Sequence, residues 1–186
     1  RIKNRFLNEW LYSSPDTIDR RLEIQGQSLG IDITVPRRIV IFEPVLKTGY
    51  SEKKSSPPHT EGAAEDELKP SDIQRHIDNT WKTVATMVRH ESDAVTLISG
   101  NVFICALGSK NDKQLLDFVR SVCAAVESRY PVLLAAGLDA KTDDYRLINS
   151  ARLKAEKALK TCLRSPSKEP RLYNTTNTEI FPSESP

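Results

Sequence analysis

The spacing of apolar residues predicts two short helices at the start of the chain, over residues 2–12 and 15–29. Pro15 suits a first helical position, and Gly30 suits the C-terminal cap of the second helix. The first helix gathers four apolar side chains on one side, namely Phe6, Leu7, Trp10 and Leu11. An amphipathic arm of this kind cannot bury its apolar stripe alone, so we expect it to pack on the rest of the chain or on a partner.

The remaining apolar runs alternate between extended and helical periods. Strands are expected over residues 37–46, 94–99, 102–107 and 131–138, and helices over residues 70–90, 111–129 and 143–163. A tight Gly100-Asn101 turn joins the second strand to the third. The order strand–helix–strand–strand–helix–strand is the ferredoxin-like plan. We therefore expect an α+β fold: an antiparallel sheet with helices on one face, preceded by an N-terminal helical arm.

Changes in composition divide the chain into three parts. Residues 1–30 form the helical arm, and residues 31–165 form the α+β domain. Within that domain, residues 47–69 combine Gly, Ser, Pro and mixed charge with few apolar side chains, which is typical of a flexible insertion. Residues 166–186 form a tail rich in Pro, Ser and Thr. Weak strands around 171–174 and 179–181 would make a short edge hairpin in this tail.

Charge and hydropathy narrow the classes of function. The chain has 27 basic and 25 acidic residues and a formal net charge of +2, so it lacks the concentrated basic face of a nucleic-acid-binding domain. No apolar run reaches the roughly 20 residues of a membrane helix, and no secretory signal is visible. Cys105, Cys123 and Cys162 form no CxxC pair, so we expect buried free thiols in a reducing cytoplasm.

The polar residues show no pattern typical of a metal or cofactor site. His59 lies in the insertion, while His76 and His90 lie too far apart on one predicted helix to share a metal. Asp139, Asp143 and Asp144 fail the spacing of a calcium loop, and a helix-capping role for Asp143 is the better interpretation. The sequence therefore predicts no metal and no cofactor.

Two stretches resemble a known family. The stretch GIDITVPRRIVIF resembles the start of the GGDEF-like domain of carbohydrate diacid regulators and their purine-catabolism relatives. The stretch AAGLDAKTDDYRLINSARLKAEKALKTC resembles the second signature of that family, which is a strand ending in Gly, a short loop and a helix with Ser and spaced Ala and Leu. The matching residues are Gly137, Ser150, Ala151, Ala155, Ala158 and Leu159. The resemblance covers about residues 17–163.

This resemblance implies a middle domain of a larger bacterial transcription regulator with a nucleotidyl-cyclase-like fold. Members of the family usually carry a sugar-diacid recognition domain before it and a helix-turn-helix domain after it. Neither is recognisable in this sequence, so DNA binding is implied only for a parent regulator. The expected partners are the other domains of that regulator and a second copy of the chain, with no membrane.

The cyclase relationship that the resemblance implies can be tested at the hairpin. A diguanylate cyclase needs acidic side chains on the first strand and in the hairpin to hold Mg²⁺ near the phosphates. Here the first strand offers Ile41 and Phe42, with Glu43 as the only acid nearby. The hairpin consists of Ser99, Gly100, Asn101, Val102 and Phe103, in which Asn101 and Val102 replace the acidic pair. We therefore expect no enzyme activity from this degenerate hairpin.

Three functions stay open on this basis. The favoured one is a non-catalytic regulatory and dimerisation module that couples signal sensing to DNA binding. Its candidate interface is the arm with Phe6, Leu7, Trp10 and Leu11. The alternative is a receptor domain for a small molecule or nucleotide that retains a degenerate cyclase cleft. The third is a vestigial cyclase.

Overall fold

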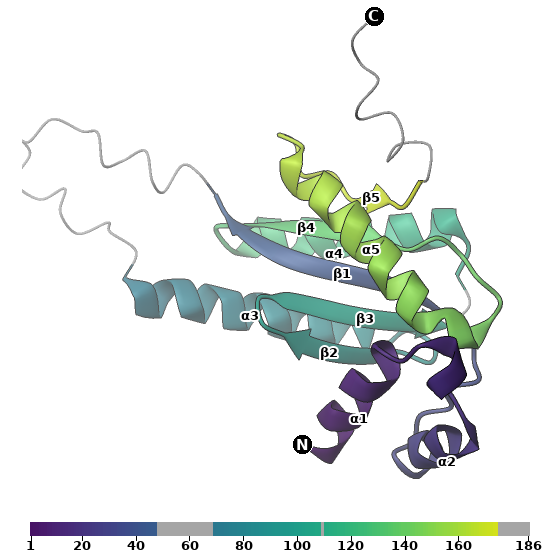
Figure 1. Cartoon of the computed structure of the whole chain (residues 1–186). Coiled ribbons are helices and arrows are strands. Elements are labelled where there is room, and N and C mark those ends of the chain that lie inside the picture. Colours follow the sequence, from purple (N-terminus) through teal and green to yellow (C-terminus); the bar gives the residue numbers. More distant parts are fainter. Residues whose placement is uncertain (48–68, 109, 175–186) are drawn as a thin grey trace, which may run out of the picture.

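A single five-stranded sheet forms the centre of the computed structural model, which describes residues 1–47, 69–108 and 110–174 (Figure 1). The strands are β1 (Arg37–Leu46), β2 (Val95–Ser99), β3 (Val102–Gly108), β4 (Val132–Leu138) and β5 (Arg171–Leu172). Their order across the sheet is β2-β3-β1-β4-β5. The first four pair antiparallel, whereas β5 pairs parallel to β4. The expected α+β class is confirmed, with a mixed sheet.

The helices agree with the sequence pattern except near their starts. They are α1 (Ile2–Leu11), α2 (Arg20–Ser28), α3 (Pro70–Val88), α4 (Asp112–Arg129) and α5 (Ile148–Arg164), with short 3₁₀ turns η1 (Pro15–Thr17) and η5 (Tyr145–Leu147). The continuous helix expected over 15–29 is wrong, because Ile18 is extended and the Asp19 carboxylate caps a new helix by accepting from the Leu22 N–H at 3.0 Å. Likewise Asp144, rather than Asp143, caps η5.

Helices cover both faces of the sheet rather than the one face expected from the ferredoxin-like plan. The arm and α5 cover one face, and α3 and α4 cover the other (Figure 1). The reason lies in β1, whose residues alternate between two separate cores. Ile39 and Ile41 belong to the first core, whereas Val40 and Phe42 belong to the second. A central strand that is apolar on both sides needs a helical layer on each face.

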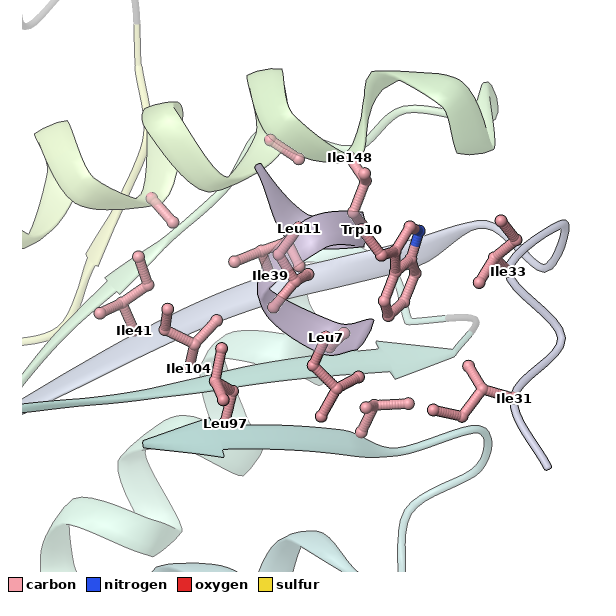
Figure 2. Packing of buried hydrophobic residues seen from close by; sticks show 14 of the residues in the cluster. Leu7, Trp10, Leu11, Ile31, Ile33, Ile39, Ile41, Leu97, Ile104 and Ile148 are labelled. Atoms are coloured by element: carbon pink, nitrogen blue, oxygen red, sulfur yellow. The ribbon is translucent and has the colours of Figure 1, made fainter. Parts of the chain in front are cut away.

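The N-terminal arm is part of the chain's own core. Phe6, Leu7, Trp10 and Leu11 are at most 3% exposed. Figure 2 shows α1 side chains among Ile39, Ile104 and Ile148 of the sheet and α5. The sequence left two surfaces open for these four residues, the rest of the chain or a partner, and the structure shows the first, because the sheet and α5 bury them. They are therefore not exposed as the candidate interface for a second copy. An apolar stripe looks the same in sequence whether its own sheet or another chain covers it.

Polar contacts hold the arm in place. Arg152 of α5 is 5% exposed, donates from Nε to the Leu11 carbonyl at 3.2 Å and lies 3.7 Å over the Tyr12 ring. The Tyr145 hydroxyl donates to Glu23 of α2 at 3.2 Å. Both contacts join the arm to the segment between β4 and the end of α5.

Gly137 allows α5 to lie directly on β4. A Cβ atom at this position would lie 2.2 Å from the Ala155 carbonyl oxygen and 2.3 Å from the Leu159 nitrogen, both of which are backbone atoms of α5. Ala151 and Ala155 present small side chains on the same side of that helix and are buried. The helix and strand therefore approach more closely than any residue with a Cβ would permit.

Two segments predicted from composition lie largely outside the described residues. The insertion over 47–69 is described only at its two ends. In the tail, the first expected strand is present as β5, but it pairs parallel to β4, and the second, around 179–181, lies beyond the described part. Among the described helices, none is both long and apolar enough to cross a membrane.

Candidate functional site

The β2–β3 hairpin lies beside the middle of β1. Ser99 pairs with Val102 across a two-residue turn, in which Gly100 has a φ of 61°. That positive φ is typical of the turns that close such hairpins, and glycine adopts it without steric cost. Because Phe103 is the register partner of Phe42 on β1, the next β1 residue, Glu43, lies close to the turn. The structure thus brings together the hairpin residues and the one acid that the sequence singled out.

Among the described residues, one side-chain hydrogen bond connects this turn to β1, between Asn101 and Glu43. The Asn101 side-chain amide donates from Nδ2 to Glu43 Oε1 at 2.8 Å, in an exposed position. Asn101 therefore presents a hydrogen-bond donor to β1, where an aspartate would present a negatively charged oxygen. The Glu43 carboxylate is therefore the one charged group that the turn and the adjacent part of β1 could offer a cation, and it already accepts this hydrogen bond.

Val102 and Phe103 direct their side chains to opposite faces of the sheet. Val102 packs against the core under α1, while Phe103 is 2% exposed and its ring centroid lies 5.3 Å from that of Trp81 on α3. The final aromatic residue of the hairpin is therefore a core residue. At position 102 an aliphatic side chain adds to packing and supplies no oxygen.

The donor set at this hairpin does not fit a magnesium–nucleotide complex. Mg²⁺ prefers several hard oxygen ligands, with carboxylates among them. In the described residues no group of three or more His, Cys, Asp or Glu side chains is arranged to hold a metal ion. His76 lies on α3 and His90 just beyond its end, whereas His59 lies outside the described residues.

A different charged cluster, which the sequence did not predict, lies at the start of β1. Arg38 is 2% exposed and donates from Nε to Asp139 Oδ1 at 2.8 Å. The second oxygen of Asp139, Oδ2, accepts from the Ile39 N–H at 2.8 Å. Arg38 also donates to the Lys110 carbonyl at 3.0 Å and pairs with Asp112 at 2.9 Å. Each polar group of this buried pair thus has a partner.

Burial decides the protonation behaviour of Asp139. Removal from water raises the pKa of its carboxyl group to about 6, although the Arg38 guanidinium and the Ile39 N–H act in the opposite direction. The sequence weighed Asp139 as part of a cation loop with Asp143 and Asp144. The structure instead buries Asp139 completely against Arg38, while Asp144 has a different role as the cap of η5.

A basic cavity of about 370 Å³ adjoins this cluster, at the start of α4. Its lining includes Arg37, Arg38, Lys110, Lys141 and Asp143. Both guanidinium groups are already used within the chain, since Arg37 donates to the Asp32 carbonyl at 2.6 Å and to the Asp93 carbonyl at 2.8 Å. A signal was present in the sequence: two adjacent arginines directly precede the apolar run Ile39–Phe42 of the strand, and buried charges require partners.

Comparison with known proteins agrees with this architecture. A family model described as a GGDEF-like domain matches residues 14–161. No curated protein matches the sequence. The solved coiled coil and GGDEF domain of DgcB from Caulobacter crescentus, in complex with c-di-GMP, is similar with a TM-score of 0.53 and 10% identity, over 87% of this chain and 83% of that one. The active GGEEF domain of a diguanylate cyclase from Vibrio cholerae has a TM-score of 0.51 and 11% identity, over 82% and 89% of the respective chains. The expected cyclase-like fold is confirmed.

Proposed function

Because this chain belongs to the family of GGDEF-like domains, we propose that it is a non-catalytic regulatory module built on a cyclase-type sheet. The observation that carries the proposal is the hairpin, where Asn101 donates to Glu43 and the partly buried Val102 packs against the core. One engaged carboxylate supplies too little negative charge to hold Mg²⁺ against nucleotide phosphates.

The test is a cyclase assay with GTP and Mg²⁺, in which the Vibrio cholerae diguanylate cyclase domain serves as the positive control. We expect no cyclic dinucleotide from this chain under conditions in which the control is active. A second arm uses Asn101→Asp/Val102→Glu, which supplies the missing carboxylates, and compares Mg²⁺ binding with that of the unaltered chain. Product formation by the unaltered chain would refute the proposal.

In the finer form of the proposal, the module belongs to a bacterial, cytoplasmic transcription regulator of the sugar-diacid type. The resemblance of residues 17–163 to that family supports this assignment. The module would couple signal sensing to a DNA-binding domain through self-association or through a change in packing. The full reading frame tests the assignment, because a helix-turn-helix region following this segment is expected and its absence would contradict the regulator class.

The alternative function is a receptor domain for a nucleotide or another small molecule. One observation favours it: a solved neighbour, DgcB, was determined in complex with c-di-GMP. Isothermal titration with GTP, GMP and c-di-GMP separates the two functions. The regulatory module without a ligand predicts no heat of binding, whereas the receptor predicts saturable binding without turnover.

A further inference from the structure

The two edges of the sheet differ in how they are protected. β5 is a two-residue strand, and such short edges offer little backbone for pairing. β2 is the opposite edge, and no other strand of the described residues pairs with its outer side. Its five residues, VTLIS, include no charged residue and no proline. Natural edge strands usually carry one of these features, because an unprotected edge pairs with other chains.

An apolar groove follows the same edge. It has a volume of about 500 Å³, and its lining includes Thr96 and Ile98 of β2, Trp81 of α3 and Asn4 of α1. Figure 1 shows α3 running behind β2 and β3, roughly along the strand direction. Ile98 is 54% exposed although its register partner, Phe103, is buried. The helix therefore leaves part of the edge strand uncovered on this face.

The charges beside the groove favour a second copy of the chain as its occupant. Asp78 and Lys82 lie one turn apart on α3, both are exposed and both line the groove. Asp78 accepts a hydrogen bond from Gln74 on its own helix, and no ion pair is recorded for Lys82 among the described residues. Opposite charges one turn apart are self-complementary, since a two-fold axis places each Asp78 opposite the other copy's Lys82.

We propose that a second copy of this chain docks along the β2 edge, with the two β2 strands antiparallel across a two-fold axis. This arrangement extends the sheet through both copies and supplies partners for the free backbone groups of β2. It also covers Ile98 of each copy and pairs Asp78 with Lys82 twice. The inference rests on the self-association included in the proposed function and locates it on a surface other than the buried arm.

The first test compares two isoleucines of nearly equal exposure by sedimentation velocity. Ile98 is 54% exposed on β2, and Ile24 is 53% exposed on α2. The unaltered chain should sediment as a dimer. Ile98→Lys should raise the dimer dissociation constant by more than about tenfold, because the change occurs twice in an isologous interface. Ile24→Lys should leave the constant unchanged. A monomeric unaltered chain, or a dimer indifferent to Ile98→Lys, would overturn the proposal.

A charge exchange provides a test that does not depend on the apolar contact. Asp78→Lys and Lys82→Asp should each weaken the dimer, because each places like charges opposite one another. The double variant Asp78→Lys/Lys82→Asp restores both pairs and should regain most of the affinity. Failure of the double variant to recover would contradict the two-fold arrangement. Circular dichroism of each variant verifies that the fold is retained.

These results are separable from the cyclase assay. A monomeric chain without cyclase activity would remove the β2 interface and leave the non-catalytic assignment intact. A dimer that converts GTP would keep the interface and remove that assignment.

Discussion

Arg38 and Glu43 are charged residues of the same strand, β1, but they lie in opposite surroundings. Near its start, Arg38 and Asp139 form a fully buried pair in which the guanidinium and both carboxylate oxygens have partners. Farther along the strand, Glu43 accepts one hydrogen bond from Asn101 in an exposed position. We therefore expect the stability of the fold to depend on the buried Arg38–Asp139 pair and to change little when the exposed Glu43–Asn101 pair is removed.

The difference between the buried and the exposed pair indicates that the buried charges have a structural role. The buried pair connects the ends of three strands through hydrogen bonds. Arg38 lies on β1, Asp139 follows β4, and Lys110, whose carbonyl accepts from Arg38, follows β3. The exposed pair at the hairpin includes a single acid, Glu43. The buried charges of β1 therefore join strands of the sheet, whereas its exposed pair consists of one hydrogen bond.

The largest expected effect comes from removing one partner of the buried pair. Arg38→Met leaves the Asp139 carboxylate buried without its counter-ion, which typically costs about 3–5 kcal/mol of unfolding free energy. Urea denaturation followed by circular dichroism measures it. Arg75→Met breaks the exposed Arg75–Asp72 pair and is the matched control, with an expected change below about 1 kcal/mol.

A double variant tests the mechanism behind that loss. Arg38→Met/Asp139→Leu removes both charges and should recover most of the stability that the single variant loses. If the single variant were as stable as the unaltered chain, the contrast between the Arg38 and Glu43 clusters would be wrong.

A pH dependence of intermediate size is expected from Asp139. Burial raises the pKa of its carboxyl group from 3.8 to about 6, so between these values the folded chain binds a proton that the unfolded chain has released. The contribution of this group to the unfolding free energy should therefore decrease as pH rises through that window. The difference in stability between the unaltered chain and Asp139→Asn, measured at several pH values, reports it.

Direct titration of the Asp139 carboxyl carbon by NMR gives an independent measurement. A midpoint at or below 3.8 would show that the guanidinium and the Ile39 N–H outweigh burial. The buried pair would then stabilise the fold increasingly as pH rises through that lower pKa.

The smallest effects are expected at the exposed pair of Glu43 and Asn101. Glu43→Gln and Asn101→Ala should each change the unfolding free energy by less than about 0.5 kcal/mol, because exposed side chains away from the core contribute little. The same urea titration measures both. A loss comparable to that of Arg38→Met would reveal a structural role for the turn and remove the contrast.

Local patterns were sufficient to predict most of the fold from sequence. Strands β1 to β4 and helices α3 to α5 appear close to the expected ranges, because their apolar periods are strong. The hairpin was predicted correctly from its Gly100-Asn101 turn. The break before α2 was missed because Ser14-Pro15-Asp16 and Asp19 are both plausible helix starts, and the choice between them depends on packing of the arm.

Contacts between distant parts of the chain could not be predicted in this way. Arg38 and Asp139 lie 101 positions apart, and no periodicity links them. The layer formed by the arm and α5 was missed for a related reason. Strands β1 to β4 all lie between these two segments in the sequence, so no local pattern links them. Apolar stripes predict burial, but they do not identify the surface that buries them.

Gly137 has a consequence for how the layers of the molecule can move. The backbone of α5 rests on that of β4 with no side chain between them at this point. Gly137 is also aligned with Ile41 of β1 and with Arg171 of β5. A sideways slide of the helix would therefore act on three strands at once, with no pliable side chain to absorb the displacement. Any signal that passes through this face should move helix and sheet as one rigid unit.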